Sequence, residues 1–368
     1  MRIAILTQPL RTNYGGILQN YALQQSLKGM GHDVSTLDDV GKRGLSPAKF
    51  LKRTGKILLG KIPASYLFYE KRYRQDYAVF TQYTRAFVNT HMDMCPYRDL
   101  IRDLTPDSFD AYIVGSDQVW RPGYNDIGRM FLDFTGDWKV RRIAYAASFG
   151  VDAWEFSPEE TKRCAELAGR FDAISVREAS GIPLCGRYLG VQAVQMPDPS
   201  MLLTGEQYAA LIDPKKTVPC EGQLFVHLLD ETPGKRKIIR SLAEKYGVSP
   251  FRCNQAERED CLEIPIEQRI QPPVEQWLRS FREAEYVVTD SFHATVFAIL
   301  FNKPFLVLDN PGRGSARMRS LLDGFGLGNC LISEDTVPSF PGIDYLRANF
   351  RLEQLRQEAK NFLSEHLK

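Results

Sequence analysis

A buried strand that runs directly into a helix is the feature that most constrains this chain. Residues 286–289 form an apolar strand that ends in a threonine, and residues 294–300 continue as an apolar helical segment. The turn between them holds Asp290, Ser291 and His293. In open α/β sheets, ligands bind in the crevice at such strand ends, where the N-terminus of the following helix favours anions. The sequence therefore predicts an α/β fold with a ligand site at this turn.

The turn has a structural interpretation as well as a functional one. Asp290 and Ser291 are residue types that cap helices, and His293 can be an ordinary residue of the first helical turn. Capping alone leaves unexplained an imidazole placed three residues after a carboxylate. Because a histidine changes its charge near neutral pH and can move a proton in catalysis, we favour the functional interpretation.

The length and composition are those of a soluble two-domain protein. The chain has 368 residues, more than one simple core accommodates, with 43% hydrophobic and 25% charged residues. Its formal net charge of +2 makes no case for nucleic-acid binding. We expect neither a signal peptide nor a membrane-spanning helix, because the N-terminus turns polar at Thr7 and no apolar run is long enough.

The cysteine pattern bears on the compartment. The seven cysteines are odd in number and include no C-x-x-C pair. This pattern argues against a structural zinc site and a disulfide framework, and it fits reduced thiols. We expect a cytoplasmic protein without a bound metal or cofactor.

Strand and helix patterns recur on both sides of a proline-containing junction at residues 196–203. The predicted strands of the first half are residues 2–6, 33–37, 111–114, 141–147 and 173–176. Those of the second half are residues 224–229, 287–290 and 304–308. We therefore predict an N-terminal Rossmann-like domain over residues 1–200 and a second one over 201–345. A helix within residues 346–368 is expected to pack back on the first domain.

Polar residues follow several strands of the first half, at the edge where ligands bind. Ser116 and Asp117 end one such strand, and Arg177 ends another. Gly15 and Gly16, between the first strand and the first helix, let backbone amides approach a ligand closely. Each signal alone is equally consistent with packing or a tight turn. Their convergence in one domain favours a site.

A basic segment follows the second strand. Residues 42–74 carry ten Lys or Arg against a single acid, with apolar residues interleaved. Such a segment can lie on an anionic membrane surface, or it can be a solvated insertion whose apolar side packs on its own domain. We favour a basic helical insertion over residues 42–90, because Gly55, Gly60 and Pro63 interrupt any long amphipathic face. Peripheral contact with a membrane surface is the second interpretation.

Six short motifs are spread over most of the chain. They are NYGGILQNYAL at 13–23, VGSDQVW at 114–120, AYAASFG at 144–150, SVRE at 175–178, DP at 198–199, and TDSFHAT at 289–295 with KPF at 303–305. In this order they resemble the polysaccharide pyruvyl transferase family. The resemblance implies a GT-B-like fold, with two Rossmann-like domains facing each other across a cleft. It also implies phosphoenolpyruvate as donor and a pyruvate ketal on a sugar as product.

The resemblance assigns roles to individual residues. His293 corresponds to the catalytic histidine of the family, and Arg177 to an arginine that binds the donor. Either Asp117 or Asp290 is expected to activate the attacking hydroxyl, or only to orient a neighbour. An anionic donor suits such guanidinium groups, which bind phosphate and carboxylate bidentately.

One position departs from the family pattern. Some members carry a donor-binding arginine where this chain has Ser291, which we still expect to contact the donor. Either Arg313 or Arg317 supplies the missing charge, or the donor is held differently. The loop that holds these two arginines has a second interpretation as a solvated turn. The expected acceptor-binding residues are Asn13, Gly15, Gly16 and Ser116.

Two other functions stay open. A glycosyltransferase that uses a nucleotide sugar has the same fold, although no distinct acidic pair beyond Glu283 and Glu285 suits a nucleotide ribose. A non-catalytic subunit of a polysaccharide assembly complex predicts decayed motifs, whereas His293 and Arg177 are intact. The sequence does not identify the acceptor, whether lipid-linked, nucleotide-linked or polymeric, nor whether the product is a capsule or an exopolysaccharide.

Overall fold

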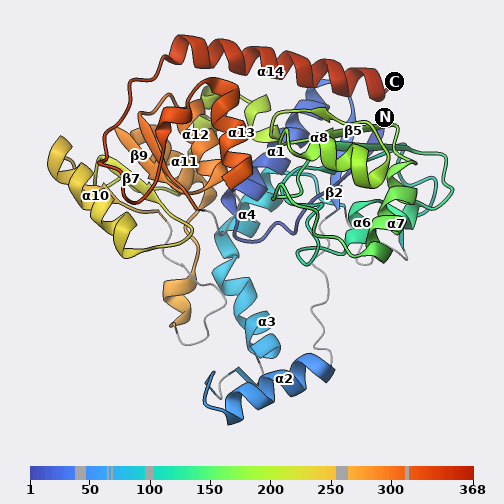
Figure 1. Cartoon of the computed structure of the whole chain (residues 1–368), viewed down its shortest axis with the longest axis horizontal. Coiled ribbons are helices and arrows are strands. Elements are labelled where there is room, and N and C mark those ends of the chain that lie inside the picture. The colour runs from blue at the N-terminus through green and yellow to red at the C-terminus, as the bar shows by residue number, and fades with distance from the viewer. Residues whose placement is uncertain (38–46, 64–65, 68, 96–102, 254–263, 311–314) are drawn as a thin grey trace.

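The chain forms two separate parallel sheets, each flanked by helices (Figure 1). The computed structural model describes residues 1–37, 47–63, 66–67, 69–95, 103–253, 264–310 and 315–368. The predicted architecture of two Rossmann-like α/β domains is confirmed.

The first sheet has, among the described residues, six parallel strands in the order β2-β1-β3-β4-β5-β6. They are β1 (Arg2–Leu6), β2 (Asp33–Leu37), β3 (Ala111–Gly115), β4 (Arg141–Ala147), β5 (Ala173–Val176) and β6 (Val194–Gln195). Leu6 pairs with Leu37, so β1 and β2 end at one edge of the sheet. Ile3 and Ile5 belong to one buried cluster and Ala4 to another, as expected of a strand covered on both faces.

The second sheet has, in the same part of the chain, five parallel strands in the order β11-β10-β9-β7-β8. They are β7 (Leu224–His227), β8 (Pro250–Phe251), β9 (Tyr286–Thr289), β10 (Phe305–Leu308) and β11 (Leu331–Ile332). The central strand β9 is the buried strand recognised in the sequence. Since α12 (Phe292–Leu300) follows it directly, the predicted strand-to-helix turn is present.

Further helices surround the two sheets. They are α1 (Tyr14–Gly29), α6 (Ile127–Met130), α7 (Pro158–Ala168), α8 (Gly181–Leu184), α9 (Gly205–Ala209), α10 (Pro233–Tyr246), α11 (Val274–Glu283), α13 (Ser315–Phe325) and α14 (Tyr345–His366). Short helical turns are η2 (Asp133–Thr135), η3 (Cys185–Leu189), η4 (Pro199–Leu202), η5 (Ile266–Arg269) and η7 (Gly328–Cys330). Among the described residues, no helix is both long enough and apolar enough to cross a bilayer.

The C-terminal helix α14 lies across both halves of the molecule (Figure 1). Leu352 packs in the cluster that contains the buried face of α12, whereas Phe362 and Leu363 pack in the cluster that contains Ile3 and Ile5 of β1. The chain crosses from the first sheet to the second between β6 and β7. The limits of the two domains themselves stay predictions.

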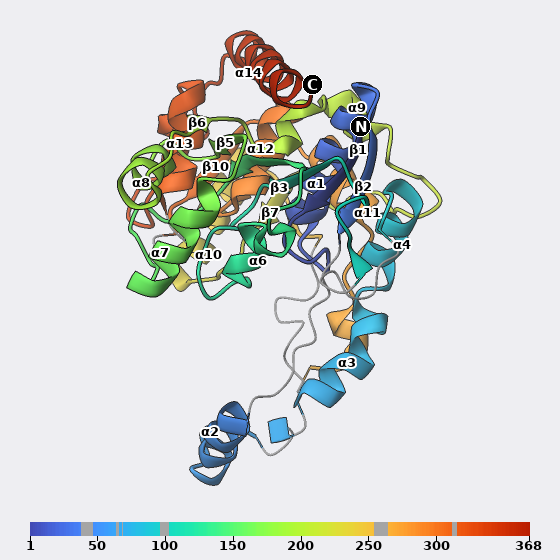
Figure 2. The ribbon, with the colours of Figure 1, turned by 90° about the vertical axis from the view of Figure 1, so that its right-hand side faces the viewer.

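The basic insertion consists of α2 (Pro47–Leu58), α3 (Tyr69–Phe80) and α4 (Gln82–His91). Helix α4 packs on the body, with Phe87 and Val88 fully buried. Helix α2 does not, since it lies at the far end of the arm formed by α3, away from both sheets (Figures 1 and 2). Its Leu51 and Leu58 side chains are 76% and 82% exposed. The favoured interpretation, in which the apolar side of the insertion packs on its own domain, is therefore wrong for α2.

Candidate active site

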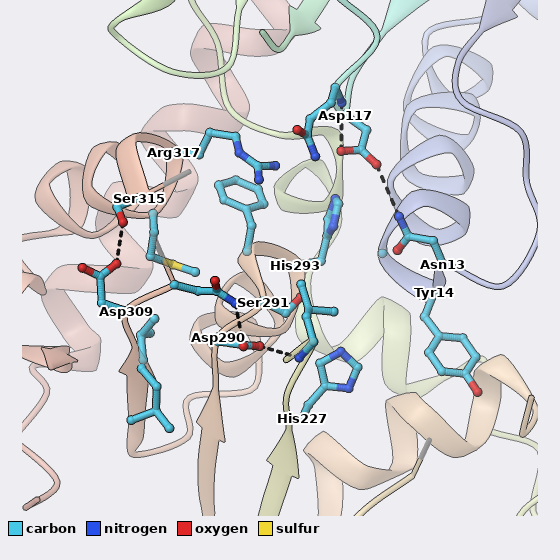
Figure 3. Close-up of a pocket in the computed structure, with 18 of the residues that line it drawn as sticks. Asn13, Tyr14, Asp117, His227, Asp290, Ser291, His293, Asp309, Ser315 and Arg317 are labelled. Carbon is cyan, nitrogen blue, oxygen red and sulfur yellow. Dashed lines mark hydrogen bonds between the residues drawn. The ribbon is translucent and has the colours of Figure 1, made fainter. Parts of the chain in front are cut away.

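The carboxyl ends of the two sheets face a cavity of about 360 Å³ (Figure 3). The first half contributes the loop after β1, the start of α1 and the turn after β3, and the second contributes the ends of β7 and β9 and the starts of α12 and α13. The expected site residues that line it are Asn13, Gly15, Asp117, Asp290, Ser291, His293 and Arg317. The cleft expected between the two domains is thus present.

His293 stands in the first turn of α12 with a buried carboxylate behind it. Its Nε2 atom lies 3.6 Å from Oδ2 of Asp198. That oxygen also accepts hydrogen bonds from Ser116 Oγ at 3.1 Å and from Arg177 Nη1 at 2.8 Å. Burial alone would raise the pKa of the Asp198 carboxyl, but the facing His293 imidazole and the Arg177 guanidinium lower it well below its usual value. Asp198 is therefore a fixed negative charge next to the imidazole.

Arg177 lies behind the cavity wall and does not line the cavity. Its guanidinium stacks on the Phe292 ring, 4.4 Å from the ring centroid, and its Nη2 atom lies 3.5 Å from Oδ1 of Asp117. The side chain is only 2% exposed. Within the described part of the chain, Nε and Nη2 have no hydrogen-bond acceptor. Arg177 thus holds two carboxylates of the site and retains unsatisfied donors.

Asp117 combines a cavity position with an unusual backbone conformation. Its φ angle is +59°, in the left-handed region that a residue with a side chain rarely adopts. Its Oδ1 atom accepts a hydrogen bond from the Gln118 N–H at 2.9 Å, and its Oδ2 atom accepts one from Asn13 Nδ2 at 3.3 Å. The strained turn after β3 thereby presents a carboxylate to the cavity.

The predicted glycine turn is the first turn of α1. Asn13 caps this helix, since its side-chain oxygen accepts a hydrogen bond from the Gly16 N–H at 3.1 Å. Gly15 lines the cavity and touches His293, because a Cβ atom on Gly15 would lie 2.2 Å from Cγ of the imidazole. The glycine here is required by the close approach of the two halves of the chain.

Asp290 is fully engaged by structural partners. Its Oδ1 atom accepts a hydrogen bond from the Leu229 N–H at 2.6 Å, and its Oδ2 atom pairs with Lys235 Nζ at 2.7 Å and with Asn310 Nδ2 at 3.0 Å. Both oxygens therefore fix the loops after β7 and β10. These contacts support a structural role for Asp290 in place of the expected catalytic one.

Two hydroxyl groups also have structural contacts. Ser291 caps α12, since its Oγ atom accepts a hydrogen bond from the Ala294 N–H at 3.5 Å, while the residue still lines the cavity. Ser116 is completely buried, donates to Asp198 and does not line the cavity. Ser116 was expected to bind the acceptor sugar, but its buried position leaves it no direct contact with the cavity.

The expected basic loop contributes one cavity residue. Arg317, in α13, lines the cavity, and burial together with the nearby charge of Arg177 lowers its pKa to about 10, so it is charged at neutral pH. Arg313 lies outside the described residues. Arg177, His293 and Arg317, which are distant in sequence, thus converge on one region.

His227, at the end of β7, is a cavity residue that sequence reasoning missed. Its Nδ1 atom lies 3.3 Å from the indole Nε1 of Trp277, which donates the hydrogen bond, so Nε2 carries the proton of the neutral ring. Burial lowers the pKa of His227 to about 4. The available signal in the sequence was its position within the predicted strand over residues 224–229, and the structure pairs it with Thr289 at the end of the neighbouring strand. Asp198 was quoted only as part of a motif, without a role.

Comparison with known proteins identifies the family. The family model described as polysaccharide pyruvyl transferase matches residues 13–312, most of the chain. The chain belongs to the polysaccharide pyruvyl transferase family. The match covers the elements that line the cavity from Asn13 to Asn310. The resemblance drawn from the six motifs is confirmed.

Several solved structures are similar to this family member at low sequence identity. The UDP-GlcNAc 2-epimerase from Neisseria meningitidis, bound to UDP-GlcNAc, is 10% identical with a TM-score of 0.48, over 100% of this chain and 99% of that chain. The UDP-GlcNAc 2-epimerase from Methanocaldococcus jannaschii is 13% identical with a TM-score of 0.45, over 96% and 92%. MurG of Acinetobacter baumannii is 11% identical with a TM-score of 0.39, over 98% and 93%. No curated protein matches the chain significantly.

Proposed function

We propose that this protein transfers the pyruvyl group of phosphoenolpyruvate to a sugar of a surface polysaccharide or its precursor, forming a cyclic ketal. Membership of the family supports polysaccharide pyruvyl transfer. The observation that carries the finer statement is the His293 imidazole at the cavity wall, 3.6 Å from the buried Asp198 carboxylate. Phosphoenolpyruvate acts as co-substrate, and we propose no metal or further cofactor.

The reaction needs one proton at the donor methylene carbon and the removal of one proton from each of two sugar hydroxyls. Protonated His293 donates to the methylene carbon while the first hydroxyl adds to the neighbouring carbon. The bond from that carbon to the phosphate oxygen then breaks, and the second hydroxyl closes the ring there. One hydroxyl proton restores the imidazolium, and the other leaves with phosphate. A single imidazole can carry both transfers near neutral pH.

Asp198 supports this cycle without touching the substrate. Its carboxylate stabilises the imidazolium each time His293 takes up a proton, and it holds the ring by facing Nε2. The opposite wall offers Asp117 to receive the other hydroxyl proton, which it then passes to the departing phosphate. Asn13 and Gly15 complete the proposed acceptor side, with Gly16 held behind them by the Asn13 cap.

The donor carries a phosphate and a carboxylate, so its site requires positive charge. Arg317 is the proposed direct contact because it lines the cavity and is charged at neutral pH. Ser291 and the first amides of α12 offer further hydrogen bonds. Arg177 is proposed to act on the donor site mainly through Asp198 and Asp117. A contribution from Arg313 stays a proposal as well.

Acceptor-dependent phosphate release tests the proposal. The protein is incubated in D2O with phosphoenolpyruvate and a panel of lipid-linked and nitrophenyl glycosides. We expect release of phosphate only with a suitable acceptor, and a ketal methyl group that carries one deuterium. The His293→Gln variant should release none. Transfer from a nucleotide sugar, without any acceptor-dependent release from phosphoenolpyruvate, would establish the glycosyltransferase instead.

The carrier of the acceptor, the location of the protein and its contact with membranes are further proposals drawn from the sequence. They are an acceptor carried on a lipid, a location in the cytoplasm, and contact of the protein with a membrane surface.

A further inference from the structure

Helix α2 presents two different faces to solvent. Phe50, Leu51 and Leu58 are 39%, 76% and 82% exposed and share one face by their helical spacing. Lys52 and Lys56, which are also exposed, lie on the other face. The helix contains no acidic residue, and Leu59 and Lys61 extend the same composition beyond it. Large exposed apolar side chains next to a purely basic face need a partner.

The arm that carries α2 is anchored to the body at its base. Arg269 in η5 pairs with Asp76 in α3 at 2.5 Å, and the Gln271 N–H donates to the Phe80 carbonyl at 3.1 Å. Tyr69 and Tyr73 stack along α3, with centroids 5.6 Å apart. Because these contacts join α3 to the second half of the chain, the arm is fixed at its base and α2 lies at a distance from the body (Figure 2).

The arm leaves the body at the edge that carries the cavity. It begins after Leu37, which pairs with Leu6, and the segment after Leu6 carries Asn13 of the cavity wall. It returns at Met94, which bridges to Thr36. Helix α2 therefore extends from the end of the first sheet at which the cavity also lies.

We propose that α2 is an in-plane membrane anchor that binds anionic lipid. The apolar face enters the boundary between headgroups and acyl chains, and the basic face stays at the negatively charged headgroups. Charge complementarity selects this occupant, because anionic headgroups provide counter-charge for the exposed Lys52 and Lys56, whereas a second copy of α2 packed on the apolar face would provide none. The proposal concerns binding only and does not depend on phosphoenolpyruvate as donor.

Vesicle co-sedimentation of the full chain tests this anchor. We expect binding to vesicles of equal parts phosphatidylglycerol and phosphatidylcholine, little binding to phosphatidylcholine alone, and weaker binding as salt rises. Replacing Lys52 and Lys56 by Gln should weaken binding about fivefold per lysine. Replacing Leu51 and Leu58 by Ser should weaken it at least about tenfold.

Matched variants elsewhere on the surface control for composition. Leu346 and Phe350 in α14 are similarly exposed, so their replacement by Ser should leave binding unchanged. Lys237→Gln with Arg240→Gln in α10 is the matching charge control. Circular dichroism melting should show that all variants fold. Equal binding to both vesicle types, or equal losses in the α2 and control variants, overturns the proposal. Dimers in gel filtration that the Leu51 and Leu58 changes dissolve, without any vesicle binding, would overturn it as well.

Discussion

Gly15 and His293, which lie in different halves of the chain, are in direct contact at the cavity wall. A methyl group on Gly15 would lie 2.2 Å from Cγ and 2.3 Å from Nδ1 of the imidazole. The first turn of α1 therefore sets the position of the first turn of α12. The proposed catalytic group is held where the two domains meet.

Replacing Gly15 by Ala should displace His293. We expect a loss of at least tenfold in kcat and a destabilisation of about 1–3 kcal/mol from overpacking. Steady-state kinetics and urea unfolding measure the two effects. The control is Gly29→Ala in the same helix. There, among the described residues, no atom other than those of the adjoining residues and helix backbone lies within 4 Å of the added methyl group, so stability should hold or rise. A fully active Gly15→Ala variant would show that the contact is not needed.

Replacing Asp198 by Asn should lower kcat by about a hundredfold or more, because the imidazolium loses its partner carboxylate. The alkaline limb of the pH–kcat/KM profile should also move, because His293 must be protonated to donate its proton, and a merely structural role would not cause this shift. Ser200→Ala is the control, since Ser200 donates to the other oxygen of Asp198 at 2.6 Å and leaves the charge in place. An unchanged pH profile in Asp198→Asn would remove its role as a partner of His293.

Variants of His293 and Arg317 should affect different quantities, the rate of pyruvyl transfer and the affinity for the donor. His293→Ala should abolish pyruvyl transfer while donor affinity stays within about tenfold, or roughly 1.4 kcal/mol. Arg317→Gln should instead weaken donor binding by about 2 kcal/mol or more, because an anion loses a charged partner. Calorimetric titration with phosphoenolpyruvate distinguishes the two. The reverse pattern would exchange their roles.

Arg177 should matter more for folding than the sequence predicted. Arg177→Ala leaves the carboxylates of Asp198 and Asp117 buried without their cation, so we expect a destabilisation of about 3–5 kcal/mol. The surface pair of Arg236 and Glu231 supplies the control, where Arg236→Ala should cost no more than about 1 kcal/mol. Urea unfolding provides both values. A stable variant that has lost only donor affinity would restore the direct donor contact first expected for Arg177.

His227 should make stability depend on pH. Because its pKa falls from 6.5 in the unfolded chain to about 4 in the folded protein, the unfolded state binds a proton first as the pH drops. Stability is therefore lost between about pH 6.5 and 4, with about 2 kcal/mol gone between pH 7 and pH 5. His227→Gln keeps an acceptor for Trp277 but cannot titrate, so its unfolding free energy should fall less over this range. Equal pH slopes in the two proteins would contradict this origin.

The positions of several strands could be predicted from the sequence, because each depends only on a local run of apolar residues. The strands Arg2–Leu6, Asp33–Leu37 and Arg141–Ala147 have the predicted bounds, since apolar runs in parallel sheets are self-contained signals. The approach of Asp198 to His293 depends on how two separate sheets dock, which no spacing encodes. The sequence likewise left open whether Asp290 activates a hydroxyl or only orients a neighbour, because its partners Lys235 and Asn310 come from other segments.

The exposure of α2 was also beyond the sequence. A basic amphipathic pattern is the same whether its apolar side packs on the body or faces solvent. Only the position of the helix at the end of the α3 arm decides between the two (Figure 1).

Two helices from different domains, α1 and α12, begin at the same cavity. Each helix start carries the equivalent of roughly half a positive elementary charge, which comes from backbone amides and cannot be titrated away. Together they form a permanent cationic background that adds to the charge of Arg317 and depends on no side-chain proton. A cavity built this way attracts anions at every pH at which the two helices are folded.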